Sequence, residues 1–551
     1  MSLLSRIQLA QDSSVTVANL VDEILVRRGN SIITVSDNGT YTLAELHAEV
    51  CEMDAWLRTT LNIQPGQTVA IYRSNNRRCF HWLLAVIRAG GIAVPLNPQL
   101  SLTEIEHILS TSGTDILIID AAVYEKNLAH RHIHSASALK LRHFIQDDPS
   151  PEVATIPGLT RFLAPPPEAF FPPTVIDPRA TIAIFHTSGT SGFPKGAALS
   201  SRALLAARAT TVITGIFLSP RDLAFVALPW SHIMAVSIAL YGLVGGIRGC
   251  FLDRFDLDAA LSLVERHRIT AFVGVPEIFT RLVNASPDPS RLRTVRLWIS
   301  ASDYLPIEVR TRLRRYGALL KLPFRRVPPV LINGYGMVEL GGLAMMGVEL
   351  SILPGASDFC FTVPPYRIRI ANEQNKSVRI GQTGELQIQR PGFKPQYWRT
   401  TPSDSTAGDD LLTTDGWLRT GDLARRNWLG LIQLVGRIKD VIKSGGYSVY
   451  VRELEEALLA HASVARAVAF GLPHAEKGEV PVAAVELHAE QSASGESDLT
   501  LWCRSRLAAY KSPRRIWIVP PGSLPQNANG KMLRRELREK FAAEMQEPSL
   551  T

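Results

Sequence analysis

Short apolar runs alternate with amphipathic stretches along most of the chain. Four runs have the length and residue types of buried strands, namely Val69–Tyr72, Ile116–Ile119, Ala271–Val275 and Val295–Ser300. Three stretches between them carry hydrophobic residues at helical spacing, namely 102–110, 259–268 and 277–284. A helix is also expected after Tyr41, where Thr42 and Glu45 have the spacing of a capping box. This alternation predicts an α/β fold with a largely parallel sheet.

The pattern changes in the second half of the chain, where a boundary between domains is expected. From about Tyr366, closely spaced strands predict a small β-rich subdomain. After Gly436 the pattern is α+β, with a helix at 452–461, strands at 465–471 and 480–487, a last helix and strand, and a short basic tail at 531–540. Because 551 residues exceed one ordinary core, we place a domain boundary at about 436–441.

Two runs of unusual charge need an interpretation. Residues 223–247 contain no Asp, Glu, Lys or Arg and are long enough to span a bilayer. Pro229, Ser231 and His232 interrupt this run, which favours a strand, a turn and a buried pocket-lining helix over a membrane helix. Residues 310–326 hold six Arg, one Lys and no acid. A solvated helix face is the favoured interpretation here, with contact to a membrane or a nucleotide as the alternative.

Composition narrows the classes of function. Hydrophobic residues make up 46% of the chain and charged residues 20%, which is typical of a soluble globular protein. The net charge of +8 suits anionic small substrates or a membrane surface, and no nucleic-acid-binding motif accompanies it. The five cysteines have no CxxC spacing, and the N-terminal segment lacks the apolar core of a signal peptide. A reducing, cytoplasmic location without disulfides or zinc is therefore expected.

A polar loop at 186–196 is the strongest candidate for a ligand site. It reads His-Thr-Ser-Gly-Thr-Ser-Gly-Phe-Pro-Lys-Gly between an apolar strand at 181–185 and a helix expected at 199–208. Glycines allow close approach of the backbone, and successive N–H groups, hydroxyls and Lys195 suit a polyphosphate. The loop lacks the Gly-Lys-Ser/Thr ending of a P-loop. The alternative is an ordinary Gly/Ser surface loop.

Four further stretches carry candidate chemistry, and each has an ordinary alternative. In 332–339, a Tyr and Glu339 lie just beyond an expected strand, although a plain turn would look the same. The stretch 417–422 places Asp422 in a tight turn, suited to ribose hydroxyls but common in turns generally. Charges in 436–447 precede a glycine pair and are equally compatible with a linker. The loop 524–531 ends in Lys531, and an isolated Lys of this kind is usually a solvated surface side chain.

Together, in this order and spacing, the five stretches resemble the adenylate-forming superfamily of acyl-CoA synthetases, nonribosomal peptide adenylation domains and luciferases. The resemblance covers nearly the whole chain and implies a reaction in two steps. A carboxylate attacks the α-phosphate of ATP to give an acyl-adenylate and pyrophosphate, and a thiol then displaces AMP. The resemblance also implies an N-terminal AMP-binding domain at 1–436, a hinge at 437–441 and a mobile C-terminal domain at 442–551.

The resemblance assigns roles to individual residues. The ATP phosphates would be held by Thr187, Ser188, Gly189, Thr190, Ser191 and Lys195, with Mg²⁺ near Thr187 and Glu339. Adenine would lie between two groups, Ser300, Ala301 and Ser302 on one side and Asn333, Gly334, Tyr335 and Gly336 on the other. Ribose would bind Asp422 and Arg437. Lys531 would bridge the attacking carboxylate and the α-phosphate, and His232 would gate the acyl pocket. The hinge would be Lys439, and the CoA thiol would face Lys443, Ser444, Gly445 and Gly446.

Several positions depart from the family pattern. Val338 stands where the family has Thr, and a lost hydrogen bond to a charged phosphate costs about 1.5–3 kcal/mol unless something replaces it. The stretch 300–303 replaces a Gly-rich turn, 355–359 replaces a turn of small residues, and Val451 stands where Pro is common. The charged motif residues all remain, so activity is expected.

The branch of the superfamily follows from two features. The segment 443–447 and the intact Pro194-Lys195-Gly196 look like CoA ligases, and an apolar pocket helix favours a fatty or aryl acid over an amino acid. We therefore expect an ATP- and Mg²⁺-dependent acyl-CoA synthetase that acts on a medium- or long-chain fatty acid, with the acid, ATP and CoA as its small-molecule partners. The alternatives are an acyl-AMP ligase that loads an acyl-carrier protein, and a degenerate homologue that binds ligand without turnover. Weak peripheral membrane contact through 310–326 is a further hypothesis.

Overall fold

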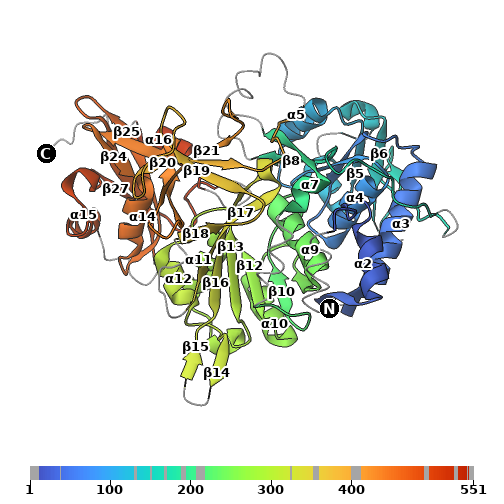
Figure 1. Cartoon of the computed structure of the whole chain (residues 1–551), viewed down its shortest axis with the longest axis horizontal. Coiled ribbons are helices and arrows are strands. Elements are labelled where there is room, and N and C mark those ends of the chain that lie inside the picture. The colour runs from blue at the N-terminus through green and yellow to red at the C-terminus, as the bar shows by residue number, and fades with distance from the viewer. Residues whose placement is uncertain are drawn as a thin grey trace.

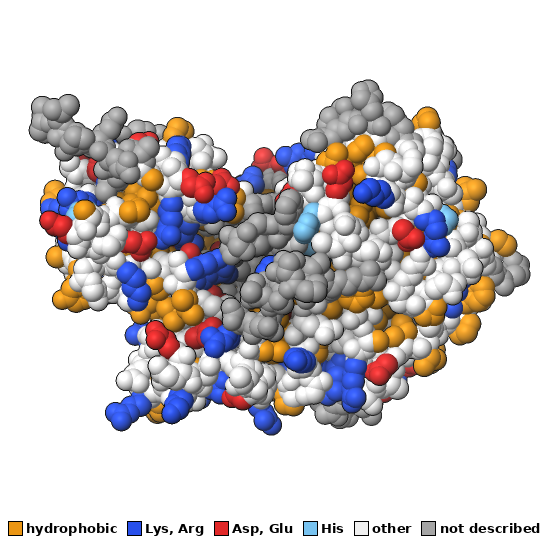
Figure 2. All heavy atoms as spheres, turned by 90° about the horizontal axis from the view of Figure 1, so that it is seen from above, with side chains coloured by type: hydrophobic (Ala, Val, Ile, Leu, Met, Phe, Trp, Pro, Cys, Tyr) orange, Lys and Arg blue, Asp and Glu red, His pale blue; other side chains and the backbone are white. Residues whose placement is uncertain are grey.

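The computed structural model describes residues 12–37, 39–129, 133, 135–148, 150, 152–166, 170–187, 194–206, 217–322, 325–350, 359–398, 411–488, 495–526, 532–542 and 544. These residues form a large N-terminal body with two principal sheets and a smaller C-terminal body built on a third (Figure 1). The C-terminal body, orange to red, lies beside the end of the larger N-terminal sheet (Figure 1). Seen from above, the surface is hollowed between the two bodies, and Lys and Arg side chains border the hollow on the C-terminal side (Figure 2).

The first sheet has seven strands in the order β7-β6-β5-β3-β4-β8-β9. They are β3 (Thr68–Tyr72), β4 (Ile92–Pro95), β5 (Ile116–Ile119), β6 (His143–Gln146), β7 (Thr160–Arg161), β8 (Thr181–Thr187) and β9 (Lys195–Ser200). All neighbours are parallel except β8 and β9. The helices of this region are α2 (Leu20–Arg28), α3 (Leu43–Thr59), α4 (Arg77–Arg88), α5 (Leu102–Ser112), α6 (Ala121–Asn127) and α7 (Ser201–Leu204). The predicted capping box of Thr42 and Glu45 starts α3.

The helix predicted at 199–208 is wrong at its start. Residues Lys195–Ser200 form β9, which pairs antiparallel with β8 from Thr187 and Lys195 back to Thr181 and Ser200. The chain leaving the polar loop therefore turns back on the strand that precedes it. The helix α7 begins only at Ser201, with the Ser200 side chain accepting a hydrogen bond from the Ala203 N–H. Residues 207 and 208 lie outside the described part of the chain.

The second sheet has thirteen strands in the order β19-β20-β21-β22-β18-β17-β16-β13-β12-β10-β11-β1-β2. Its parallel strands are β1 (Ile32–Ser36), β11 (Arg248–Phe251), β10 (Leu223–Val226), β12 (Ala271–Gly274), β13 (Leu297–Ala301) and β16 (Val330–Met337). Its antiparallel strands are β2 (Gly39–Thr42) at one edge and β17 (Gly342–Glu349), β18 (Phe359–Thr362), β22 (Ile432–Arg437), β21 (Leu418–Arg426), β20 (Thr383–Gln389) and β19 (Arg367–Ala371) at the other. The α/β class is confirmed, and the predicted β-rich part is the antiparallel end of this sheet.

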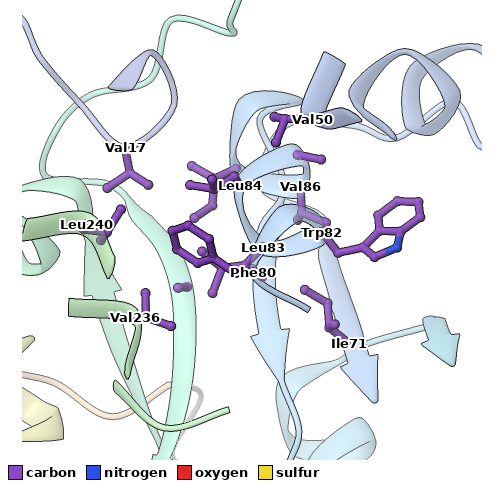
Figure 3. Packing of buried hydrophobic residues seen from close by; sticks show 14 of the residues in the cluster. Val17, Val50, Ile71, Phe80, Trp82, Leu83, Leu84, Val86, Val236 and Leu240 are labelled. Atoms are coloured by element: carbon purple, nitrogen blue, oxygen red, sulfur yellow. The ribbon is translucent and has the colours of Figure 1, made fainter. Parts of the chain in front are cut away.

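The uncharged run at 223–247 forms the strand, turn and buried helix that were predicted from the polar residues interrupting it. It consists of β10, a turn, and the buried helix α9 (Ile233–Gly245). One face of α9 packs on α4, where Val236 and Leu240 face Phe80 and Leu84 (Figure 3). This packing fixes α9 between the two sheets. In the described part of the chain, no helix is both long and apolar enough to cross a membrane.

The arginine-rich stretch 310–326 is not the solvated helix face that was expected. The helix α12 (Ile307–Leu313) ends early, and β14 (Leu320–Leu322) and β15 (Arg325–Val327) follow as a hairpin. Arg310 is only 2% exposed and its Nη1 lies 3.4 Å from Glu349, which also pairs with Arg314 at 3.1 Å. The compensating acid comes from β17, so the local sequence could not reveal that part of the run is buried.

The C-terminal body contains a five-stranded sheet with three helices. Its strands are β23 (Val441–Ser444), β24 (Tyr447–Tyr450), β25 (Val464–His474), β26 (Gly478–Leu487) and β27 (Ile516–Val519), and its helices are α14 (Val451–Leu459), α15 (Glu496–Arg504) and α16 (Arg534–Ala542). The basic tail predicted at 531–540 is therefore largely helical. Leu537 and Phe541 of α16 are buried, and Phe541 stacks on Trp517 at 4.4 Å. These two apolar positions, four residues apart, anchor an otherwise charged segment.

Candidate active site

A cavity of about 850 Å³ lies where the N-terminal sheets meet the C-terminal body. Predicted site residues that line it are Thr187, Lys195, His232, Ala301, Ser302, Asn333, Gly334, Tyr335, Gly336, Glu339, Asp422, Arg437 and Lys439. Ser300 is buried directly behind this wall, 1% exposed. Ser188, Gly189, Thr190, Ser191 and Lys531 lie outside the described residues. The structure thus brings together residues from segments that are hundreds of positions apart in the chain.

One polar wall of the cavity is formed by the ends of β8 and β9. Thr187 and Lys195 are direct partners across the two strands, and the Thr187 hydroxyl donates to the Lys195 carbonyl at 3.4 Å. Opposite them, Glu339 is 7% exposed and accepts a hydrogen bond from the Tyr397 hydroxyl at 2.8 Å. Lys195 Nζ lies 5.8 Å from the centre of the Tyr397 ring. Burial, and then the charge of Glu339, raise the pKa of Tyr397, so its hydroxyl remains a donor.

Tyr397 was missed by the sequence analysis. It is 58 positions from its partner Glu339 and follows a stretch with no motif of its own. No local signal distinguishes it from an ordinary surface tyrosine. His186 also lines the cavity without a predicted role. Its Nδ1 is buried with no hydrogen-bond partner among the described residues, and burial lowers its pKa to about 4.

A second polar cluster joins Tyr335, Asp422 and Arg437. Asp422 and Arg437 are direct partners across β21 and β22, and Arg437 Nε lies 3.4 Å from Asp422 Oδ1. The Tyr335 hydroxyl donates to Asp422 Oδ2 at 2.5 Å. Burial, followed by the charge of Asp422, raises the pKa of Tyr335 well above 10. The cluster fixes a carboxylate in the cavity wall, with the Tyr335 hydroxyl bound to one oxygen and the Arg437 guanidinium near the other.

Two predicted local conformations are wrong at this cluster. Asp422 lies within the strand β21 rather than in a tight turn, because Leu418–Arg426 pairs on both sides, with β20 and with β22. Tyr335 lies within β16 rather than beyond its end, because β16 continues to Met337 by pairing with β17. Gly336 permits this pairing, since a Cβ there would come 2.1 Å from the Gly342 carbonyl oxygen.

Where β13 and β16 meet, two buried polar atoms have no partner among the described residues. Ser300 of β13 and Asn333 of β16 are direct partners across the two strands. The Ser300 hydroxyl and Asn333 Oδ1 are buried, and neither has a hydrogen-bond partner within the described part of the chain. Buried polar atoms are nearly always satisfied, so an unpaired acceptor in a cavity wall suits a ligand with an N–H donor. The exocyclic amine of adenine is such a donor.

The apolar side of the cavity follows α9. His232 caps this helix, with its Nδ1 accepting from the Met234 N–H at 3.2 Å. Burial lowers the pKa of His232 to about 4, so the ring is neutral near pH 7. Beyond it the wall is mainly apolar and includes Leu218, Val226, Met234, Ile238 and Phe251. His232 therefore stands where the polar and apolar halves of the cavity meet.

The residues predicted to form a hinge and to face CoA lie between the strands β22 and β24. Lys439 belongs to a short helical turn, Ile438–Asp440, between β22 and β23. Burial, and then the nearby Arg437, lower its pKa. Lys443, Ser444, Gly445 and Gly446 form the end of β23 and its turn into β24, and they do not line the cavity. The Lys443 ammonium instead donates to the Ser448 hydroxyl at 2.8 Å.

A magnesium ion would fit the wall around Thr187 and Glu339 only as a partner of a bound nucleotide. The described residues contain no group of three or more His, Cys, Asp and Glu that could hold a metal alone. The Glu339 carboxylate and the Thr187 hydroxyl are the oxygen ligands that the cavity wall offers there. Mg²⁺ usually binds through one or two protein oxygens, waters and substrate phosphates, so these two residues are sufficient.

Comparison with known proteins covers most of the chain. The AMP-binding enzyme family matches residues 21–398, and the AMP-binding enzyme C-terminal domain matches residues 453–531. A long-chain-fatty-acid–CoA ligase of Yersinia pestis is 29% identical over 514 residues, which are 88% of this chain and 87% of that protein. A feruloyl-CoA synthase of an Amycolatopsis species is 29% identical over 509 residues, 91% of this chain and 94% of that protein. The crystal structure of ATP-bound MatB from Rhodopseudomonas palustris has a TM-score of 0.78 at 24% identity, covering 96% of this chain and 99% of that one.

Proposed function

Because the chain belongs to the AMP-binding enzyme family, we propose that it is an ATP-dependent acyl-CoA synthetase for a medium- or long-chain fatty acid. One observation carries the proposal. The cavity joins a charged end, with Lys195, Glu339, Asp422 and Arg437, to an apolar end along α9. A nucleotide triphosphate and an acyl chain would therefore meet near His232, where the two ends join.

The charged end supports binding of ATP. Lys195 is a phosphate donor at the mouth of the β8–β9 hairpin, and Glu339 with Thr187 would hold Mg²⁺, which neutralises phosphate charge when bound. The Asp422 carboxylate would accept hydrogen bonds from the ribose hydroxyls. Asn333 would receive the adenine amine on its unpaired oxygen. These assignments place the triphosphate along the wall from Asp422 towards Lys195.

The reaction would proceed by displacement at the α-phosphate. An oxygen of the substrate carboxylate forms a bond to the α-phosphorus, and the bond to the β-phosphate oxygen breaks, so pyrophosphate leaves. Lys531 would stabilise the charge that develops between the two groups, a role that typically contributes about 10²–10³-fold in rate. In the second step the CoA sulfur attacks the acyl carbon and AMP leaves. The segment Lys443–Gly446 would face the thiol in that step.

The apolar end supports an acid with a long hydrocarbon portion. Met234 and Ile238, which are four residues apart on α9, line the cavity together with Leu218 and Phe251. Burial of each methylene contributes about 0.8 kcal/mol, so such a wall favours longer chains. The name of the Yersinia relative agrees with this choice.

An aryl acid is a second candidate, and a specific feature favours it. Phe80 stacks on Trp230 at 5.1 Å and Trp230 contacts Phe251 at 4.8 Å, and all three line the cavity. Such a group of rings accommodates a planar substrate through offset or edge contacts. The Amycolatopsis relative is named for an aryl substrate.

ATP–pyrophosphate exchange across a panel of acids tests the proposal. The panel should contain saturated fatty acids of increasing length, hydroxycinnamic acids and amino acids. Exchange that is strongest with the longer fatty acids supports the proposal, and strongest exchange with hydroxycinnamic acids selects the second candidate. Detection of an acyl-CoA product distinguishes a CoA ligase from an acyl-AMP ligase that loads a carrier protein. Exchange with none of the acids would overturn the enzymatic assignment.

A substitution in the apolar wall of the cavity tests whether the acyl group binds there. Ile238→Trp places a large ring in the middle of the apolar end. Exchange with long acids should fall at least about tenfold while exchange with short acids persists, because only the long chain needs that volume. An equal fall for all acids would place the acyl group elsewhere.

A further inference from the structure

A pocket of about 210 Å³, here called the second pocket, lies at one end of the β8–β9 hairpin. None of the described residues that line it also lines the larger cavity, and none received a role from the sequence. They come from the two strands and from the segments around Arg179 and Lys394, and they are Arg179, Thr181, Ala198, Ser200, Arg202, Gly392, Phe393, Lys394 and Gln396. The second pocket is therefore separate from the site described above.

The length of the hairpin keeps the two sites apart. Thr187 and Lys195 are direct partners at the end that lines the larger cavity. Thr181 and Ser200 are direct partners at the opposite end and line the second pocket. A strand rises about 3.3 Å per residue, so the run from Lys195 to Ser200 separates the two sites by about 17 Å. A phosphate group bound at one site cannot reach the residues of the other.

The floor of the second pocket is formed by β9. Ala198 and Ser200 are two positions apart on this strand, so they share one face of it, and they are 6% and 5% exposed. The Ser200 hydroxyl accepts a hydrogen bond from the Ala203 N–H at 3.2 Å. A hydroxyl that accepts one hydrogen bond can still donate another. The floor therefore offers a buried donor to a ligand.

Arg202 is held at the rim of the second pocket through its backbone and its side chain. Its N–H donates to the Pro178 carbonyl at 2.9 Å, and its carbonyl accepts from Arg390 Nη2 at 2.6 Å. Its guanidinium lies against Gly392, where a Cβ would come 3.4 Å from both Nη1 and Nη2. Gly392 has a φ of +70°, in the left-handed region that favours glycine. The turn that contains Gly392 thus leaves room for the guanidinium.

The segment that carries Lys394 is fastened to the edge of β9. The Ala198 N–H donates to the Gln396 carbonyl at 3.0 Å, and the Trp398 N–H donates to the Gly196 carbonyl at 2.8 Å. These backbone hydrogen bonds place Lys394 and Gln396 beside the strand that forms the floor. The side-chain amide of Gln396 adds a further donor to the lining.

The lining of the second pocket has charges of one sign only. Arg179, Arg202 and Lys394 are cations, and no Asp or Glu lines the pocket in the described part of the chain. Among those same described residues, no ion pair joins any of the three to an acid. The nearest acid in the sequence, Asp177, accepts from the Arg179 backbone N–H at 2.8 Å and does not line the pocket. A cleft lined by charges of one sign concentrates the electric field and attracts the opposite charge, here an anion.

The size of the second pocket and its donors narrow the class of anion. One water molecule takes about 30 Å³ in the liquid, so the pocket holds about seven, which is room for a phosphate group and less than a whole nucleotide needs. Guanidinium groups bind phosphate oxygens in pairs, and an ammonium adds a compact charge. Arg179, Arg202 and Lys394 are exposed, so the pocket opens to solvent and can also receive a phosphate attached to a larger molecule.

We propose that the second pocket binds a dianionic phosphate group, either as free inorganic phosphate or as the end of a phosphate monoester. The guanidinium groups of Arg179 and Arg202 and the ammonium of Lys394 bind its oxygens at the rim, and the Ser200 hydroxyl donates to it from the floor. The inference goes beyond the proposed function and does not depend on it, because no residue of the pocket takes part in the assigned reaction.

Isothermal titration calorimetry of the full-length protein with inorganic phosphate, without nucleotide, tests the inference. Binding should persist in Lys195→Gln, which removes a cation of the larger cavity. The dissociation constant should rise at least about tenfold in the double variant Arg202→Gln/Lys394→Gln, the lower end of the scale for lost hydrogen bonds to a charged group. The matched control is Arg315→Gln/Lys376→Gln, which removes the same two exposed charges outside both sites.

Three results of the titration would overturn the inference. They are the absence of phosphate binding in the unsubstituted protein at millimolar concentration, a loss of binding in Lys195→Gln with none in the double variant, and equal losses in the double variant and its control. Thermal unfolding provides a second readout, because a ligand that binds only the folded state raises the unfolding temperature. Phosphate should raise it in the unsubstituted protein and in the control, and not in Arg202→Gln/Lys394→Gln. Should that double variant fail to fold, Arg179→Gln replaces it, with the same expected results.

A comparison of anions distinguishes the two sources of the phosphate group. Glycerol 3-phosphate that binds as tightly as inorganic phosphate, or more tightly, identifies the end of a monoester as the ligand. Glycerol 3-phosphate that binds at least about tenfold more weakly identifies free phosphate. Acetate has a single charge and two oxygens, so it should bind far more weakly than either. Acetate binding as tight as that of phosphate would overturn the assignment of a phosphate site.

Discussion

Replacement of Tyr335 by Phe tests the cluster that we expect to bind the ribose of ATP. The Tyr335 hydroxyl donates to Asp422 Oδ2 at 2.5 Å, and Arg437 Nε lies 3.4 Å from the other oxygen. Tyr335→Phe removes the shorter contact and keeps the ring in the cavity wall. Because burial and Asp422 raise the pKa of Tyr335 well above 10, the hydroxyl is a donor throughout the neutral range. The comparison is therefore insensitive to the choice of assay pH.

The expected size of the effect follows from the charge of Asp422. A hydrogen bond to a charged group contributes about 1.5–3 kcal/mol. The Asp422 side chain is 14% exposed and keeps Arg437, so water and the guanidinium replace part of the loss. We expect the lower end of the range, which corresponds to a rise of about tenfold in the Michaelis constant for ATP. The ribose takes no part in bond breaking, so kcat should change by less than about threefold.

ATP–pyrophosphate exchange at saturating acid, measured against ATP concentration, gives both constants. Tyr72→Phe is a matched control, because its buried hydroxyl accepts from Asn127 at 2.7 Å and donates to the Leu100 carbonyl at 3.4 Å within the first sheet. It loses a buried tyrosine hydroxyl with two neutral partners away from the cavity, so it controls for the loss of the hydroxyl itself. An unchanged Michaelis constant in Tyr335→Phe, or the same rise in both variants, would refute the reasoning.

Three further predictions address catalysis, stability and pH. Lys531→Ala should lower the rate of adenylate formation about 10²–10³-fold and leave thioester formation from supplied acyl-adenylate intact, and equal rates of exchange would remove its assigned role. Asp147→Asn should lower the free energy of unfolding in urea by about 3–5 kcal/mol, because Asp147 is fully buried and pairs with Arg73 and with Arg78 at 2.7 Å; a loss under about 1 kcal/mol would contradict this. Burial lowers the pKa of His232 from 6.5 to about 4, so its stabilising contribution is complete above pH 6.5 and is lost as the pH falls towards 4. His232→Gln should flatten that part of the curve of unfolding free energy against pH, and an unaltered slope would show that other groups cause it.

Helices and strands were predicted well from the sequence where a short run of residues is completely buried or has one buried face. The run Ile116–Ile119 is β5 with the same bounds, and the Thr42–Glu45 capping box starts α3. Errors occurred where a distant partner decides the conformation. Residues 199 and 200, which were expected to begin a helix, end the strand β9 because β8 is available to pair with them, although Ala and Leu favour a helix locally. The basic stretch at 310–326 was misread because Glu349, which neutralises Arg310, comes from another strand.

The site was predictable in its charged members and not in the groups that orient them. The family resemblance carried by five stretches assigned roles to Glu339, Asp422 and Arg437, and all three line the cavity. Tyr397, which donates a hydrogen bond to Glu339, has no motif around it. A position that must supply a particular charged group for the chemistry can be occupied by very few residue types. Its supporting hydrogen bond can be supplied by many residue types from many positions, so sequence alone does not locate it.

The register of neighbouring strands, rather than the loops, fixes the geometry of the polar half of the cavity. Thr187 faces Lys195 across β8 and β9, Ser300 faces Asn333 across β13 and β16, and Asp422 faces Arg437 across β21 and β22. In the two antiparallel pairs, β8–β9 and β21–β22, direct partners have their Cβ atoms about 4.5–5.5 Å apart, which is close enough for one ligand group to contact both. A slip by one residue would turn each side chain to the other face of its sheet. Such a slip would also move the buried hydrophobic side chains of these strands out of the core, and the core therefore opposes it. The apolar pattern that predicted the strands thus also keeps the polar partners in the cavity opposite one another.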